Sequence, residues 1–246
     1  WNNLGHAYHK LERYKDSSEA YLQALRINPE HAAAWYNLGI AYRHLEQYNE
    51  AIKAFRHVLR ITPGDAKAWN NLGYAFHKLE RYKDVITAYR QALRINPDDA
   101  SSWYNLGVAY RNLERFQDVV DACRQVLRID PAHAQAWNCL GGASLKLERY
   151  RDAIDAYRQS LRINPDDAAA CYNLGIAFRN LEQYNDAIKA YREALRIDPA
   201  HVQAWNNLGI AYFLSGNLTA ALDAVRELRI LDPEQAEKLL AMIERR

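Results

Sequence analysis

The chain has 246 residues, of which 49% are hydrophobic, 25% charged and 11% aromatic, a composition that supports a packed core and excludes a disordered or collagen-like chain. The 32 Lys and Arg residues nearly balance the 30 Asp and Glu residues, for a formal net charge of +2, which argues against a nucleic-acid-binding surface spread over the whole molecule. No apolar run is long enough to cross a bilayer, so no membrane insertion is expected.

The prolines and tryptophans divide the chain at a fixed interval. A proline recurs every 34 residues, at Pro29, Pro63, Pro97, Pro131, Pro165, Pro199 and Pro233. The tryptophans keep the same spacing, at Trp1, Trp35, Trp69, Trp103, Trp137 and Trp205, and Cys171 occupies the one slot between the last two. A fixed period of this length indicates a repeat architecture.

Each repeat carries two amphipathic helical patterns. In the second repeat, apolar residues recur at helical spacing over residues 32–45 and again over 48–59. Acidic residues begin the second helix and arginines end it, which suits the helix macrodipole. The proline then stops that helix, and Asp98 or Asp99 can cap the one that follows.

A glycine stands inside every expected first helix, for example Gly39 and Gly175. In a helix interior, glycine is less favourable than alanine by about 1 kcal/mol. Its repetition therefore predicts that another helix approaches closely, and the expected partners are small residues of the second helices: Ala51, Ala153, Ala187 and Ala221.

The order of these residues matches a known repeat. The spacing Trp-x2-Leu-Gly-x2-Tyr, followed by Ala, Phe and Pro, stands at Trp35, Leu38, Gly39, Tyr42, Ala51, Phe55 and Pro63. It resembles the tetratricopeptide repeat (TPR), as found in bacterial TPR scaffolds and in the TPR region of O-GlcNAc transferase. The resemblance implies an all-α fold, an α-solenoid in which seven 34-residue helix-turn-helix units form a right-handed superhelix whose first helices line a concave groove.

The same register sets the expected domain organisation. Residues 1–235 would form seven repeats, at 1–31, 32–65, 66–99, 100–133, 134–167, 168–201 and 202–235. Residues 236–246 would form a C-terminal capping helix, with Leu239 and Ile243 packed back on the last repeat, so the array is expected to end near residue 246. The chain begins at Trp1 without Met or a signal-peptide pattern, from which we expect a longer natural N-terminus and a cytoplasmic protein.

The resemblance also implies that the ligand-facing positions lie on the first helices. Two residues after each Trp slot stands an asparagine, at Asn3, Asn37, Asn71, Asn105, Asn173 and Asn207, and only Cys139 breaks the series. An exposed amide both donates and accepts hydrogen bonds, so such a ladder can hold an extended peptide backbone, similar to the asparagine ladder of O-GlcNAc transferase. The alternative is that these asparagines bridge neighbouring helices.

The rest of this face is aromatic and cationic. It carries Tyr36, Tyr104 and Tyr172, followed by Arg43, His77, Arg111 and Arg179, and by Lys78. No acidic residue appears within a first helix before Glu46 and its equivalents. This separation of charge predicts a positive groove that binds an extended acidic or phosphorylated segment; the alternative is that the cations only solubilise the surface.

We expect a non-enzymatic protein-protein interaction scaffold without cofactor or metal. The sequence shows no Gly-rich phosphate loop, paired catalytic carboxylates or Ser/His/Asp arrangement. His6 and His9 lack a third ligand, and the three cysteines are not spaced like a metal site. Three alternatives stay open: the substrate-recruiting arm of a larger enzyme such as a glycosyltransferase, RNA binding through the groove Tyr and Arg residues, and self-association through an open N-terminal repeat. Nucleic acid is the less favoured partner, because the Trp, Gly and Pro positions are those of a TPR.

Overall fold

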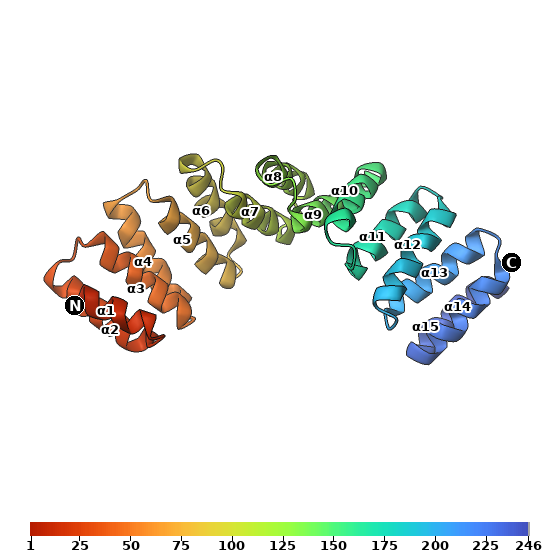
Figure 1. Ribbon diagram of the computed structural model, residues 1–246, viewed down its shortest axis with the longest axis horizontal. Helices are drawn as coiled ribbons and strands as arrows, with labels where there is room; N and C mark the ends of the chain where they lie inside the picture. Colours follow the sequence, from red (N-terminus) through yellow and green to blue (C-terminus); the bar gives the residue numbers. More distant parts are fainter. Residues whose placement is uncertain (246) are drawn as a thin grey trace. The chain divides into compact units, whose positions relative to one another are not determined.

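The computed structural model describes residues 1–245, which form fifteen α-helices and no strand, arranged as consecutive helical hairpins (Figure 1). This confirms the predicted all-α repeat fold. The helices are α1 (Asn2–Lys10), α2 (Tyr14–Ile27), α3 (Ala32–His44), α4 (Tyr48–Ile61), α5 (Ala66–Lys78), α6 (Tyr82–Ile95), α7 (Ala100–Asn112), α8 (Phe116–Ile129), α9 (Ala134–Lys146), α10 (Tyr150–Ile163), α11 (Ala168–Asn180), α12 (Tyr184–Ile197), α13 (Val202–Leu214), α14 (Leu218–Leu231) and α15 (Pro233–Glu244).

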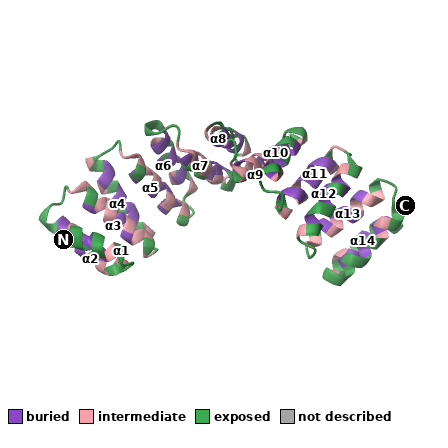
Figure 2. Cartoon of the chain, viewed as in Figure 1, coloured by how far each residue is buried: buried purple, intermediate pink, exposed green. Residues whose placement is uncertain are grey.

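The helices group into two compact units. The first unit spans Trp1–Ile129 and holds α1–α8, whereas the second begins at Asp130 and holds α9–α15. Within each unit every helix packs against the next one in the chain, and neighbouring first helices also touch directly, as α3 does with α1 and α5, and α11 with α9 and α13. The buried residues form the sides of the helices that face these neighbours (Figure 2).

A hydrogen bond between side chain and backbone explains why tryptophan and proline share one period. The indole Nε1 of Trp35 donates to the carbonyl oxygen of Pro29 at 2.7 Å, and Trp69, Trp103, Trp137 and Trp205 repeat this bond to the proline six residues earlier. The proline has ended the preceding helix. The tryptophan of the next helix therefore fixes the linker between two repeats.

The turn inside each hairpin uses a left-handed residue. Glu12, Glu46, Glu80, Glu114, Glu148 and Glu182 have φ between 55° and 58°, and Gly216 takes the same role in the last repeat with φ of 84°.

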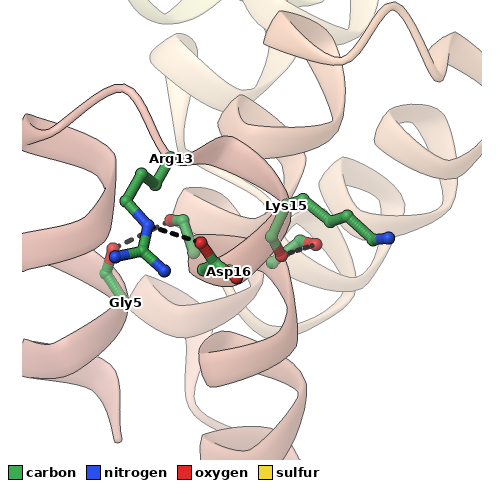
Figure 3. Close-up of polar contacts among 6 residues, drawn as sticks. Gly5, Arg13, Lys15 and Asp16 are labelled. Carbon is green, nitrogen blue, oxygen red and sulfur yellow. Dashed lines mark hydrogen bonds and ion pairs between the residues drawn. The ribbon is translucent and has the colours of Figure 1, made fainter.

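The second helix then begins with a short ion pair in several repeats. In the first repeat Arg13 Nε lies 2.6 Å from Asp16 Oδ2, and Ser17 Oγ donates to the carbonyl oxygen of Gly5 at 2.8 Å (Figure 3).

From α3 onward, each first helix is capped by the side chain of the residue just before it. Asp99 Oδ1 accepts the backbone N–H of Ser102 at 3.2 Å, which confirms it as an N-cap, whereas Asp98 pairs with Arg128 at 2.6 Å. In other repeats a histidine replaces the aspartate, and its Nδ1 accepts the same backbone N–H group, as His31 does from Ala34 at 3.2 Å. The linker histidines are therefore structural caps.

Most of the helix-interior glycines face aromatic rings, and the expectation that Ala51, Ala153, Ala187 and Ala221 are their nearest partners is wrong. A Cβ atom at Gly39 would lie 2.6 Å from Phe55, and one at Gly175 would lie 2.5 Å from Tyr191. Gly107 and Gly209 are different, because Cys123 and Val225 stand in the slot of the ring. The nearest atom to an added Cβ is 3.5 Å away at Gly107, whereas at Gly209 it is Leu239 of α15, 2.6 Å away. Glycine is thus required where a second-helix ring packs closely against the first helix.

The C-terminal helix begins earlier than expected, at Pro233, with Asp232 Oδ1 accepting the N–H of Gln235 at 3.0 Å. Leu239 and Ile243 are buried against the last repeat in one cluster with Leu228, as predicted. Arg246, the end of the predicted capping segment, lies outside the described residues. Within residues 1–245, no helix has the length and apolar character needed to span a membrane.

Candidate binding face on the first helices

The predicted site residues all lie on the first helix of their repeat. We call the side of α1, α3, α5, α7, α9, α11 and α13 that carries them the first-helix face. Its predicted members are Asn3, Asn37, Asn71, Asn105, Asn173, Asn207, Tyr36, Tyr104, Tyr172, Arg43, His77, Lys78, Arg111 and Arg179. None of these seven helices contains Asp or Glu.

Asn71 is a buried link between two first helices. Its side chain is only 8% exposed. The amide nitrogen donates to the hydroxyl of Tyr36 at 3.1 Å and to the carbonyl oxygen of Lys67 at 2.8 Å, and the amide oxygen accepts from Arg43 Nη1. Tyr36 and Arg43 belong to α3, so this amide joins α3 to α5.

The same arrangement recurs in the second unit. Asn207 is also 8% exposed, donates to the hydroxyl of Tyr172 at 2.9 Å and accepts from Arg179 Nη1 at 2.9 Å. At Asn71 and Asn207 the interpretation that these asparagines bridge neighbouring helices is therefore confirmed. Their amides hold Arg43 and Arg179 in place.

The other asparagines of the series lie closer to solvent. Asn3 and Asn105 are exposed, and Asn37 and Asn173 are half-buried. Asn105 forms a side-chain hydrogen bond with Tyr89. Four of the six predicted amides thus keep some access to solvent.

A second kind of hydrogen-bond network occurs in repeats that have asparagine after the tryptophan. Asn70 Nδ2 donates to Asp99 Oδ2 at 2.8 Å, and Ser102 Oγ lies 2.6 Å from both Asn70 Oδ1 and Asp99 Oδ2. Burial acts to raise the pKa of Asp99, but the hydrogen bonds from Ser102 and Asn70 outweigh it and hold this pKa below its usual value. Asn138 and Asp167 repeat the contact at 3.0 Å. The residue directly after the Trp slot decides which network forms: a tyrosine there bonds Asn71 or Asn207, and an asparagine there bonds Asp99 or Asp167.

Tyr74 belongs to this face and is absent from the predicted site. The guanidinium carbon of Arg43 lies 4.9 Å from the centroid of the Tyr74 ring, and Lys78 Nζ lies 5.6 Å from the same centroid. Tyr74 directly follows the glycine of its helix, a slot that holds Ile40, Val108, Ile176 and Ile210 in four other repeats, and His6 and Gly142 in the remaining two. A comparison of that slot across the 34-residue register would have singled it out.

The histidines of this face respond to the surrounding positive charge. Burial lowers the pKa of His77, and the neighbouring Lys78 and Arg111 lower it further. Burial likewise lowers the pKa of His9, together with His44, His6 and Arg43. Both histidines are therefore disposed to stay neutral among cations.

The positive charge is concentrated in the first unit. The slots of Arg43 and Lys78 hold Phe213 and Leu214 in α13, and α9 has Leu145 in place of the arginine. In the second unit only Lys146 and Arg179 continue the cationic series. The sequence predicted a positive groove, and its 34-residue register shows where along the chain that charge diminishes.

The cysteines form no disulfide among residues 1–245. Burial, with Glu193 and Asp167 nearby, raises the pKa of the Cys171 thiol to about 11, so this thiol stays protonated at neutral pH. Cys123 is buried and Cys139 half-buried. Within the described part of the chain, no cluster of three or more His, Cys, Asp or Glu side chains could hold a metal ion.

Two cavities lie between second helices, away from this face. One of 420 Å³ separates α6 from α8 above Trp103 and Tyr110. The other, of 590 Å³, separates α12 from α14 above Trp205 and Tyr212, in the same slots three repeats later. Gaps therefore open on the second-helix side, while several neighbouring first helices touch one another.

Comparison with protein families agrees with this architecture. Sequence models of the tetratricopeptide repeat match residues 2–66 and 172–236, 66–99 and 100–133, and 132–200. The chain belongs to the tetratricopeptide repeat family. Proteins of this family are in general non-enzymatic scaffolds for protein-protein interactions.

Solved structures of similar fold include three TPR proteins. The C-terminal part of a TPR repeat-containing protein from Cytophaga hutchinsonii has a TM-score of 0.83 at 14% identity, over 98% of this chain and 99% of that one. YrrB, described as a TPR protein with an unusual peptide-binding site, has a TM-score of 0.69 at 21% identity, over 76% and 97%. MamA of Desulfovibrio magneticus RS-1 has a TM-score of 0.65 at 25% identity, over 69% and 96%. No match to the sequence was found among the curated proteins.

Proposed function

We propose that this chain is a protein-interaction scaffold that binds an extended acidic segment of a partner protein along the first-helix face of Trp1–Ile129. One observation carries the proposal. Among residues 1–245, every ion pair between Lys or Arg and Asp or Glu joins residues of second helices, linkers or α15, and none involves a cation of a first helix.

Unpaired cations on one face attract an acidic partner. Lys10, Lys78 and Arg111 are exposed on three first helices of the unit, α1, α5 and α7, whereas the acids lie on the linkers and second helices. Charge complementarity of this kind speeds encounter and fixes register, and it discriminates against basic partners. The peptide-binding site described for YrrB, a repeat array of similar fold, supports a peptide as the ligand.

Solvent-accessible amides supply the groups that hold a peptide backbone. Within the described residues, the side chains of Asn3 and Asn37 form no hydrogen bond, so each can donate to and accept from a peptide unit. Asn71 is excluded from this role because Tyr36, Lys67 and Arg43 already engage its amide. The proposed contacts are thus a subset of the predicted ladder.

The test compares three fluorescein-labelled peptides of twelve residues, built from alternating Ser and Glu, Ser and Gln, or Ser and Lys. Fluorescence anisotropy at 50 and 300 mM NaCl measures their affinities. We expect the Glu peptide to bind more tightly than the Gln peptide and the Lys peptide not to bind, with weaker Glu-peptide binding at high salt.

Two triple variants locate the binding surface. Lys10→Gln, Lys78→Gln and Arg111→Gln remove three charges from the first-helix face, and we expect roughly tenfold or greater loss of affinity for the Glu peptide. The matched control, Lys15→Gln, Lys83→Gln and Arg151→Gln, removes three exposed charges from the starts of second helices. Equal effects of the two triple variants would reject the first-helix face as the binding surface.

Self-association is a second candidate, favoured by the exposed apolar side chains of the first repeat. Trp1 is 59% exposed, Leu4 41% and Leu11 67%. Light scattering over a hundredfold concentration range tests it: a rising mass that Leu4→Ser and Leu11→Ser abolish would support this candidate, and a constant monomer mass would reject it.

A further inference from the structure

Two cations from different repeats converge on one aromatic ring of the first unit. Arg43 reaches from α3 to α5, where it donates to Asn71 and lies over Tyr74. Lys78, one helical turn after Tyr74 on α5, lies within 6 Å of the same ring centroid. Both charges therefore contact the same ring.

The arginine is held in place, but its charge is not neutralised. Asn71 is buried and fixed by two further hydrogen bonds, so it keeps the guanidinium over α5. A guanidinium has five N–H donors and an ammonium has three, and Asn71 uses one of those of Arg43. Within the described residues neither Arg43 nor Lys78 pairs with an acidic side chain. Most of their donors are therefore available to a ligand.

The unbalanced positive charge acts on His77, which lies next to Lys78. His77 lies on α5 beside Lys78, and its pKa is lowered by burial, by Lys78 and by Arg111, with only a weaker opposing effect from Glu80. An anion bound between Arg43 and Lys78 would offset this repulsion. It would therefore raise the pKa of His77 on binding.

We propose that Arg43, Lys78 and the Tyr74 ring form a subsite for a phosphorylated Ser or Thr side chain of the bound segment. This inference rests on the proposed function, since the phosphate belongs to the extended peptide. A phosphomonoester carries a charge of about −1.5 to −2 near pH 7, which matches two cations, whereas a carboxylate matches one. The fixed guanidinium supplies paired donors, and the lysine adds a point charge.

The second unit contains the same framework without the subsite. Tyr172, Asn207 and Arg179 reproduce Tyr36, Asn71 and Arg43. However, Ile210 stands in the slot of Tyr74 and Leu214 in that of Lys78. The framework therefore folds with apolar residues at both slots, and the variant Tyr74→Ile with Lys78→Leu is expected to fold.

The experiment uses three labelled twelve-residue peptides that differ only at the central position, which is Ser, Glu or phosphoserine in an otherwise acidic sequence. For the wild-type chain we expect the phosphoserine peptide to bind at least tenfold more tightly than the Glu peptide at 150 mM NaCl. In the Tyr74→Ile, Lys78→Leu variant the two affinities should become equal. Lys146→Gln, at the slot of Lys78 in the second unit, is the control and should keep the preference.

Equal affinities of the Glu and phosphoserine peptides for the wild type would overturn the subsite while leaving acidic-peptide binding intact. A phosphoserine preference that survives in the double variant would overturn it as well. If no peptide binds, the proposed function fails, and the subsite is decided with inorganic phosphate at fixed pH. Ring-proton NMR shifts of His77 that saturate with phosphate and vanish in the double variant support it, and unchanged His77 signals reject it.

Discussion

The amide of Asn71 donates to the hydroxyl of Tyr36, 3.1 Å away and 35 residues earlier in the chain. Asn207 and Tyr172 repeat this bond at 2.9 Å in the second unit. In both places the same amide also accepts from an arginine of the preceding first helix. A position that looks like one element of a peptide-binding ladder is thus a joint between repeats, and it fixes the direction of a cation.

The hydrogen bonds of Asn71 predict that replacing Asn71 and replacing Asn37, which hold equivalent positions, have unequal effects on stability. Asn71→Ala should lower the free energy of unfolding by about 1–3 kcal/mol, because it leaves the hydroxyl of the half-buried Tyr36 and part of Arg43 without a partner. Asn37→Ala should change it by less than about 0.5 kcal/mol, since that half-buried amide has no bond to lose. Urea unfolding followed by circular dichroism measures both. Equal losses would show that Asn71 does not stabilise the joint.

The contacts of the helix-interior glycines predict opposite effects of one substitution. Gly107→Ala should stabilise the chain by about 1 kcal/mol, because alanine is the better helix former and the added Cβ meets only ordinary contacts. Gly175→Ala should destabilise it by about 1–3 kcal/mol, because the Cβ would lie 2.5 Å from the buried ring of Tyr191. Thermal unfolding midpoints should therefore move in opposite directions. A lower midpoint for Gly107→Ala would contradict the assignment of free space beside Cys123.

The buried tyrosines of the second helices give a third matched pair. The hydroxyl of Tyr191 has no hydrogen-bond partner. Asn207, which holds the slot of Asn105, is engaged instead by Tyr172 and Arg179. The corresponding residue beside the Asn71 joint is Phe55.

Tyr191→Phe should therefore stabilise the chain by about 1 kcal/mol, by removing an unsatisfied buried hydroxyl. Tyr89→Phe should destabilise it by about 1 kcal/mol, because the Tyr89 hydroxyl bonds Asn105. Differential scanning calorimetry of the two variants beside wild type tests this. A destabilising effect of Tyr191→Phe would mean that the hydroxyl has a partner in solution.

The repeat period made the fold predictable from the sequence, because each helix end depends on residues a few positions away. Pro63 follows the end of α4, Asp65 caps α5, and Trp69 of α5 donates to the carbonyl oxygen of Pro63; all three contacts are local. The cations of the first helices were predictable for the same reason. The period alone assigns each of these residues to a slot.

Side-chain contacts between neighbouring repeats could not be predicted from the residue at a single repeat position. Asn37 and Asn71 occupy equivalent positions, yet only Asn71 finds a tyrosine on the preceding first helix. That difference depends on which residue follows the tryptophan one repeat earlier, so it appears only when the repeats are compared in pairs. The glycine partners were mistaken for a similar reason: the ring of Phe55 reaches farther across the helix interface than the side chain of Ala51.

The positive surroundings of His9 and His77 predict how stability depends on pH. Burial lowers both pKa values in the folded chain, as do His44, His6 and Arg43 around His9, and Lys78 and Arg111 around His77. Below the ordinary value of 6.5 the unfolded chain therefore binds more protons than the folded one. The stabilising contribution is complete above pH 6.5 and is lost as the pH falls through the lower folded pKa values.

The thermal midpoint should accordingly fall between pH 7.5 and pH 5.5, a range in which few carboxylates titrate. A variant with His9→Gln and His77→Gln should lose less over the same range. All other histidines are unchanged in this variant, so the difference between the two curves isolates His9 and His77. Identical pH dependence in the two proteins would show that neither histidine has a lowered pKa, and the proposed crowding of positive charge on the first-helix face would lose its support.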